Sequence, residues 1–436
     1  MKIKKGDKKI IRAWAFYDWA NSAYALVISS AIFPIFFQNV TNKDGNDTLH
    51  FLGHSFKNTE LYSYALAFSF LMVALLSPIL SSIADYSGNK KSFMKFYTYL
   101  GAISTAILFF FKGPETVWIG ITFSILGSIG FWGSLVFYNA YLPEIAHEEQ
   151  QDKVSAMGFA FGYVGSVLLM LFNLSMILKP DWYSISDPGL PARISFLSVG
   201  IWWIVFSQYT FKVLPNNVYE VKPPKRKGYL LIGFKELWRV FKELFNYKNL
   251  VFFLISFFLY SFAAQTIFYV AGLFGSKELG LASGKLITTI LVIQLVGIVG
   301  ALGFSRISRI IGNIKALQVI LFIWIGITIS AYYLNKNNPN VEYQFYTLGA
   351  FVGLVMGSIQ ALSRSTYSKM LPENTHKHAT YFSFYDFLEK IAIVLGTFAF
   401  GLLEALTGSM KSALLLMSVF FFLGMLILGF IKRKKS

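Results

Sequence analysis

The chain has 436 residues, of which 55% are hydrophobic and 14% are charged, and its formal net charge is +17. In a soluble domain about a quarter of the residues are charged. This composition therefore excludes an ordinary soluble protein and predicts an integral membrane protein. The sequence also contains no cysteine, so no disulfide contributes to its stability.

Apolar segments recur along the whole chain, and each is long enough to cross the hydrocarbon core of a membrane as a helix. The first segment follows a basic leader, but it is longer than the apolar part of a signal peptide, so we expect it to be retained. We expect twelve membrane-spanning helices at residues 12–37, 60–84, 92–111, 115–142, 153–178, 192–213, 249–273, 284–308, 314–334, 343–367, 379–406 and 412–431.

The basic residues predict the orientation, because Lys and Arg gather in the short cytoplasmic segments of membrane proteins. With both termini inside, most of the 39 Lys and Arg residues fall on the cytoplasmic side. We therefore expect a multi-pass protein of a bacterial cytoplasmic membrane, with both termini in the cytoplasm. The positive charge then faces anionic lipids, and no nucleic-acid partner is needed to explain it.

The first span contains an ionisable residue, Asp18, within the stretch "WAFYDWANSAY". Asp18 lies roughly 10 Å into the span at helical rise, where a charge facing lipid is strongly unfavourable. We expect it to face protein or water, beside Tyr17, Asn21 and Tyr24 on a polar and aromatic side of the helix. Two roles remain open: binding a proton or a substrate amine, or packing between helices as a neutral or ion-paired carboxylate.

Two pairs of similar segments recur at nearly the same separation in the sequence. "ADYSGNKK" (84–91) corresponds to "SRIIGNIK" (308–315), and "YNAYLPE" (138–144) corresponds to "YSKMLPE" (367–373). Each pair follows equivalent spans in the two halves of the chain. The pattern predicts a parallel repeat, with two six-helix units of the same orientation related by an axis along the membrane normal, as in secondary transporters.

A hydrophilic linker separates the repeats. It covers residues 214–248, between a first bundle at 1–213 and a second bundle at 249–436. The linker contains "KPPKRKG" (222–228) and then an amphipathic segment (229–245), which we interpret as a helix at the inner membrane surface. Its apolar side consists of Leu230, Phe234, Leu237, Phe241 and Leu244. The alternative is a docking site for a partner such as a calmodulin-type protein.

The loop between the second and third spans is similar to a signature of the major facilitator superfamily, Gly-x-x-x-Asp-x-x-Gly followed by basic residues. The matching residues are Asp85, Gly88, Lys90 and Lys91, while Ser81 replaces the first glycine. Gly88 would permit the tight turn, and Asp85 is expected against the positive N-terminal end of the eleventh span when the inner side is closed. The alternative is an ordinary charged turn.

Four longer segments resemble the vacuole-effluxer family, a branch named for autophagy-linked fungal amino-acid exporters. They are "FYDWANSAYALVI" (16–28), "FYNAYLPEIA" (137–146), "VSAMGFAFGYVG" (154–165) and "GSIQALSRSTYSKMLP" (357–372). The resemblance implies amino-acid export. The seventh span departs from it, since the family favours Asn-Asp-Gly before Gln-Thr and this chain has Ser-Phe-Ala (261–263) there. Any role that the family's aspartate has in the seventh span is therefore not expected in this chain.

In this superfamily the first, fourth, seventh and tenth spans line the substrate path. The resemblance therefore adds Tyr138, Asn139, Gln265, Thr266, Gln360 and Arg364 to the candidate residues of the first span. Arg364 is either a ligand for a substrate carboxylate or a gate residue near the inner end of its span.

The eleventh span carries Asp386, Glu389 and Lys390. Asp386 and Lys390 are one helical turn apart, a spacing that favours an internal ion pair. The alternative is a proton relay in which a carboxylate titrates during the transport cycle.

The sequence shows no catalytic constellation, and we expect no enzyme activity and no cofactor. The five histidines are expected in loops, and "HKH" (376–378) lacks further ligands for a metal. The chain also lacks the glycine-rich loop that binds ATP phosphates, which argues against transport driven directly by ATP.

We therefore expect an all-α membrane protein with twelve transmembrane helices in two six-helix bundles, the major facilitator fold. The expected function is secondary transport of a small organic solute by alternating access, with proton-coupled efflux of amino acids implied by the resemblance. The alternatives are transport of another small solute, such as a peptide-like or cell-wall fragment, and a non-transporting scaffold or sensor. The expected partners are the small-molecule substrate, a proton or other coupling ion and anionic lipids, and the chain is expected to be a monomer.

Overall fold

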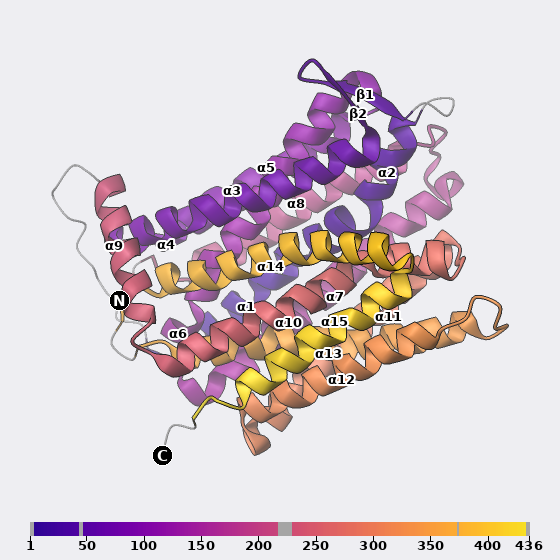
Figure 1. Ribbon diagram of the computed structural model, residues 1–436. Helices are drawn as coiled ribbons and strands as arrows, with labels where there is room; N and C mark the ends of the chain where they lie inside the picture. The colour runs from indigo at the N-terminus through magenta and orange to yellow at the C-terminus, as the bar shows by residue number, and fades with distance from the viewer. Residues whose placement is uncertain (1–3, 43–46, 217–228, 373–374, 433–436) are drawn as a thin grey trace.

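The computed structural model describes residues 4–42, 47–216, 229–372 and 375–432 (Figure 1). Twelve helical segments in these ranges are long and apolar enough to cross a membrane, which confirms the expected spans with boundaries shifted by a few residues. Both chain termini and the linker helix α9 lie at one end of the helices, called here the termini end. The opposite end carries a small β-hairpin and is called the hairpin end.

Six spans form the first half of the molecule. The first span is continuous over α1 (Lys8–Ala23), a π-helical segment (Tyr24–Ala31) and α2 (Ile32–Thr41). The other five spans are built on α3 (Asn58–Ser87), α4 (Lys90–Ile107), α5 (Val117–Ala140), α7 (Gln151–Leu178) and α8 (Leu190–Val213). Short connecting helices are α6 (Leu142–Ile145) and the 3₁₀ turns Leu108–Phe110, Pro114–Thr116, Glu148–Gln150 and Pro180–Tyr183.

Six further spans form the second half. They are α10 (Lys248–Leu273), which continues as a π-helical turn (Phe274–Glu278), followed by α11 (Ser283–Ile311), α12 (Asn313–Tyr333), α13 (Val341–Met370), α14 (His378–Thr407) and α15 (Met410–Leu428). The two halves meet mainly where α7 packs against α11 and α13, and where α14 packs against α3 and α5.

A proline explains the π-helical segment in the first span. Pro34 has no backbone N–H, and its ring would clash with the carbonyl of Ser30 in a regular α-helix. The Ser30 hydroxyl donates to the Ala25 carbonyl at 2.8 Å, five residues earlier in the chain. Such π-helical turns are frequent at functional sites, because they redirect side chains within a helix.

One short β-hairpin departs from the all-helical expectation. Strands β1 (Thr48–Phe51) and β2 (His54–Lys57) pair in antiparallel register, with Thr48 opposite Lys57. The hairpin lies in the loop between the first two spans, and Leu49 packs one side of it against the helices.

The linker contains the expected amphipathic helix, α9 (Tyr229–Leu244). Val240 and Leu244 are buried, whereas Phe234, Trp238 and Phe241 are exposed. The helix contacts α3 of the first half and α14 of the second half. The exposed aromatic side chains are suited to a membrane interface. The basic segment 222–228 and the side chain of Leu230 lie outside the described residues.

Candidate functional site

A cavity of about 180 Å³ lies between the two halves in the middle of the helices. Its walls come from both halves: α1, the π-helical segment, α5 and α7 on one side, and α10, α11, α13 and α14 on the other. The candidate residues that line it are Asp18, Asn21, Asn139, Gln265, Gln360, Arg364 and Glu389. The fold thus brings together polar residues that lie far apart in the sequence.

An ion pair between the halves forms one part of the cavity wall. Arg364 Nη1 of α13 lies 3.6 Å from Asp18 Oδ2 of α1, and both side chains are almost fully buried. The Tyr138 hydroxyl donates to the same carboxylate oxygen at 2.7 Å. Asp18 therefore faces protein and the cavity.

The guanidinium of Arg364 is held in place by several further contacts. Its Nε donates to Ser155 Oγ at 2.9 Å, its Nη2 donates to the Ser155 carbonyl at 2.8 Å, and its Nη1 donates to Asn139 Oδ1 at 3.2 Å. The ring of Phe159 lies 4.3 Å from the guanidinium carbon, measured to the ring centroid. Since hydrogen bonds and ring contacts use the planar fork of arginine, lysine would not replace it here.

A glycine allows this cluster to form. A Cβ atom on Gly158 of α7 would lie 2.6 Å from Asp18 Oδ2 and 2.8 Å from the Tyr138 hydroxyl. These two atoms are hydrogen-bonded to each other, so neither can move away from an added methyl group without breaking that bond. The small residue therefore determines how closely α7 approaches α1.

We expect Gly158→Ala to abolish transport and to lower the free energy of unfolding by about 1–3 kcal/mol, because the added methyl group overpacks the cluster. The matched control is Gly326→Ala, where a Cβ atom meets nothing within 4 Å. Transport in proteoliposomes and thermal unfolding in detergent measure the two effects. Normal transport by Gly158→Ala would show that the cluster tolerates displacement.

A second charged cluster lies on α14. Lys390 Nζ lies 2.9 Å from Asp386 Oδ1 and 3.0 Å from Glu389 Oε2, so two carboxylates share one ammonium group. Gln265 Nε2 of α10 donates to Glu389 Oε1 at 3.1 Å. Lys390 is fully buried, and its Nζ lies 3.6 Å from the centroid of the Trp132 ring.

Several candidate residues do not line the cavity. The Tyr17 hydroxyl bonds to Thr98 Oγ1 at 2.6 Å, and Tyr24 packs on Phe131 and Trp203 within the first half. The others are Tyr138, Thr266, Asp386 and Lys390, which lie behind the cavity wall. The expectation that the aromatic side of the first span faces the cavity is therefore wrong for Tyr17 and Tyr24, because bulky rings fill the helix bundle and the smaller Asp18, Ser22 and Ser29 face the cavity.

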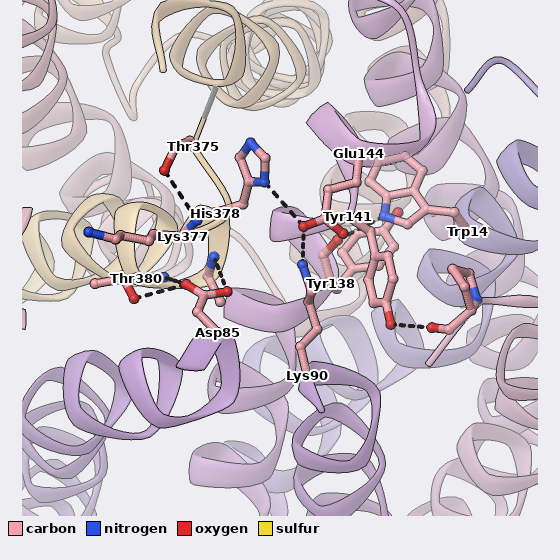
Figure 2. A network of polar contacts seen from close by, with 12 residues as sticks. Trp14, Asp85, Lys90, Tyr138, Tyr141, Glu144, Thr375, Lys377, His378 and Thr380 are labelled. Atoms are coloured by element: carbon pink, nitrogen blue, oxygen red, sulfur yellow. Dashed lines mark hydrogen bonds and ion pairs between the residues drawn. The ribbon is translucent and has the colours of Figure 1, made fainter. Parts of the chain in front are cut away.

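At the termini end, Asp85 connects the halves (Figure 2). Its Oδ1 accepts from the Ala379 backbone N–H at 3.2 Å, and its Oδ2 accepts from the Thr380 N–H at 2.7 Å and the Thr380 hydroxyl at 2.9 Å. These N–H groups belong to the first turn of α14, which has no helical acceptor for them and carries a positive partial charge. The contact is the one that the loop signature implies, and its role as a gate stays a prediction.

Gly88 follows the last residue of α3 with φ at 67°, a left-handed conformation that glycine adopts without strain. The rest of the loop is held by a network around Glu144 (Figure 2). Lys90 forms a buried ion pair with Glu144, which also lies 3.1 Å from His378 Nδ1. Lys91 Nζ donates to the Leu214 carbonyl at the start of the linker, at 2.6 Å.

Glu144 and His378 were missed as candidate residues. His378 was expected in a loop, but it is the first residue of α14 and is buried. Glu144 belongs to the repeated segment 138–144, and that repeat was the one signal in the sequence for its importance. The pairing itself depends on contact between the halves, which the sequence did not reveal.

A second polar contact joins the halves at the termini end. Asp152, in the first turn of α7, accepts from Asn313 Nδ2 at 2.7 Å and from Ser308 Oγ at 3.3 Å, and pairs with Lys369 at 2.7 Å. Asn313 and Ser308 lie in the segment that corresponds to the Asp85 loop. Both loops therefore contact the first turn of a helix in the other half, so the termini end is closed.

The chain is similar in sequence to known membrane proteins. A model of the family described as "Vacuole effluxer Atg22 like" matches residues 6–436. The chain is 30% identical over 427 residues to an uncharacterized MFS-type transporter, YxiO, of Bacillus subtilis (strain 168), and this match covers 97% of the chain and 95% of the relative. It is 23% identical over 457 residues to autophagy-related protein 22 of Kluyveromyces lactis, covering 95% and 91% of the two chains.

Solved structures show the same fold. The crystal structure of the Major Facilitator Superfamily transporter FucP in the outward conformation matches with a TM-score of 0.69 at 12% identity, covering 98% of this chain and 99% of that one. The proton:xylose symporter XylE, bound to 6-bromo-6-deoxy-D-glucose, matches with a TM-score of 0.70 at 14% identity, covering 97% and 95%. At these identities the likeness establishes the arrangement of helices in two six-helix bundles.

Proposed function

Since the chain belongs to the vacuole effluxer Atg22-like family of major facilitator transporters, we propose that it exports amino acids by alternating access, coupled to a proton gradient. The observation that carries the proposal is the small cavity between the halves, with acidic, basic and amide side chains among the apolar residues of its wall. Its volume of about 180 Å³ is smaller than the ~300–1,000 Å³ typical of sites for drug-sized ligands, which favours a small cargo.

The cavity offers partners for both charged ends of an amino acid. The Arg364 guanidinium and the Asn21 amide are donors for a carboxylate, and the carboxylate of Glu389 is an acceptor for an ammonium group. Asp18 is the other acid in the wall, but it is paired with Arg364. Cargo binding at Arg364 would compete with this ion pair and thereby weaken a contact between the halves.

Alternating access requires that the closed end opens while the other end closes. The contacts of Asp85, Glu144 and Asp152 close the termini end in the conformation described here. We infer that these contacts break when the cavity opens at that end. Gating is the role we propose for Asp85, Gly88, Lys90 and Lys91.

We place the termini end in the cytoplasm of a bacterial cell, because the basic residues of the chain gather there. The absence of native cysteines makes this placement directly testable. A membrane-impermeant maleimide should label His54→Cys, in the exposed hairpin, on intact cells, and should label the exposed Glu149→Cys only after permeabilisation. The reverse pattern would show that the protein has the opposite orientation.

The test of the proposed function is counterflow in proteoliposomes loaded with a mixture of unlabelled amino acids. We expect labelled amino acids to accumulate transiently with the wild type, and an imposed pH gradient to drive their net movement. Liposomes without protein serve as the control for leakage. If no amino acid exchanges across the membrane, the assignment of amino acids as cargo is wrong.

A further inference from the structure

A second cavity, of about 1410 Å³, lies at the termini end of the second half. Its wall comes mainly from the ends of α10, α12, α13 and α15 and from the residues next to these ends. No residue lines both this cavity and the central one. Polar and apolar side chains share the wall, and its five lysines outnumber its two acids, Glu148 and Glu243. The cavity is therefore basic as well as large.

Three of the five lysines have no acidic partner. Within the described ranges, their ammonium groups form no ion pair and no hydrogen bond. They are Lys248 at the start of α10, Lys315 in the first turn of α12 and Lys432 after the end of α15. The other two are paired with acids that lie outside the wall, Lys369 with Asp152 and Lys377 with Glu236.

The fold holds two of the unpaired lysines close together. Asn249 Nδ2 donates to the Lys432 carbonyl at 2.9 Å, and Asn249 Oδ1 accepts from the Lys432 backbone N–H at 3.2 Å. Lys248 is the neighbour of Asn249 in the chain, so these bonds fasten the end of α15 beside the start of α10. Like charges that are held together repel each other, and a bound anion removes this repulsion.

The third unpaired lysine, Lys315, has a counterpart in the first half. Lys91 and Lys315 take the last position of the similar segments 84–91 and 308–315, and both loops turn at a glycine with positive φ, 67° and 87°. Lys91 is 8% exposed, and its Nζ donates to the Leu214 carbonyl. Lys315 is exposed and lines the cavity, where no described carbonyl takes the place of that acceptor. The second half thus leaves open an acceptor position that the first half fills with its own backbone.

An exposed apolar surface adjoins the cavity where α10 and α15 meet. Phe252 and Phe430 are 36% and 64% exposed, and their ring centroids lie 6.1 Å apart. They lie three residues after Asn249 and two residues before Lys432, the pair whose hydrogen bonds join the two helix ends. A basic pocket between the ends of membrane-spanning helices suits a lipid phosphate, and exposed aromatic rings beside it suit the rest of the lipid. A soluble phosphate would use the lysines alone.

We propose that this cavity binds the headgroup of an anionic phospholipid from the membrane leaflet at the termini end. The phosphate oxygens accept hydrogen bonds from the ammonium groups of Lys248, Lys315 and Lys432, and the acyl chains lie against Phe252 and Phe430. The site is separate from the central cavity, so the proposal does not depend on which cargo the protein moves.

Cysteine labelling of the full-length protein in nanodiscs tests the site, because the chain has no native cysteine. Asn246→Cys places a thiol in the cavity wall, whereas Ser92→Cys places one on the exposed termini end of the first half, outside the cavity. Phosphatidylglycerol added to discs of phosphatidylcholine should slow labelling of Asn246→Cys by a neutral maleimide at least ~tenfold, and should not slow labelling of Ser92→Cys. Equal rates for Asn246→Cys in both kinds of disc would overturn the proposal.

Charge variants separate this site from general attraction to anionic lipid. Replacing all three unpaired lysines by Gln should abolish the slowing. The matched control, Lys8→Gln/Lys9→Gln/Lys153→Gln, removes three exposed lysines from the same end of the first half and should keep it. Equal loss in both variants would show that no specific site exists. If millimolar inorganic phosphate protects Asn246→Cys in phosphatidylcholine discs as well as phosphatidylglycerol does, the assignment to a lipid is wrong.

Discussion

Arg364→Ala is expected to abolish transport and to lower the free energy of unfolding by about 3–5 kcal/mol, because it leaves Asp18 as an unpaired charge in a buried site. It also leaves Ser155 and Asn139 without their shared donor. Arg364→Lys should restore part of the stability and little of the transport, since a single ammonium group does not reproduce the contacts of the guanidinium. Thermal unfolding and counterflow measure the two effects separately.

The double variant Asp18→Asn/Arg364→Gln provides the control for charge. Removing both charges should recover much of the stability lost in Arg364→Ala, because no unpaired carboxylate remains. Arg193→Ala is the control at the hairpin end, where the arginine is also buried but its partner Asp187 has a side chain that is 52% exposed, so the remaining carboxylate keeps its contact with water. That variant should lose at most about 1 kcal/mol from the ion pair and keep transport. An Arg364→Ala protein as active as the wild type would refute the role proposed for the ion pair.

Asp85→Asn is expected to weaken closure of the termini end by about 2 kcal/mol, a ~30-fold change in the ratio of closed to open molecules. The amide keeps the shape of the side chain, but it removes the charge and one of the two acceptor oxygens that face the first turn of α14. Transport should become slower, because the conformation that is closed at the termini end is then less populated.

The measurement uses Ala361→Cys. Because the natural chain has no cysteine, this substitution introduces the only reactive thiol. Ala361 is fully buried, and its carbonyl accepts from the Ser155 hydroxyl across the interface at 2.7 Å. The rate of maleimide labelling from the termini side should rise by up to ~30-fold in Asp85→Asn. It should not change in Glu149→Gln, which alters an exposed acid at the same end. Equal rates in all three proteins would show that Asp85 does not hold the closed state.

The sequence was sufficient to predict the number of spans, because the apolar length of each segment is a local pattern. The repeat, which is indicated by similar loop segments, stays a prediction. The proximity of Asp386 and Lys390 could be predicted in the same way from their spacing along one helix. The roles of these residues in transport stay predictions.

Apart from Asp85 and the first turn of α14, which the resemblance to the loop signature implied, contacts between distant segments could not be predicted. Asp18 and Arg364 lie in different halves, and nothing in the spacing of residues shows that two helices from different bundles meet at the same depth. A helical stripe shows which residues share a side, but not what that side contacts, and for this reason Tyr17 and Tyr24 were expected in the cavity. Lys390 was expected to pair with Asp386, and the structure adds Glu389 as a second partner.

The π-helical segment of the first span has a consequence for which residue changes this helix tolerates. One extra residue in a helix rotates everything beyond it by about 100°, so the stripes before and after Tyr24–Ala31 are not continuous. Asp18, before this segment, and Ser29, within it, both line the cavity. Deleting a single residue between them would rotate the distal part of the span by about 100°, so its cavity-lining side chains would no longer face the cavity. A substitution would leave this orientation unchanged. We therefore expect the helix to tolerate most substitutions in this segment better than a change in its length.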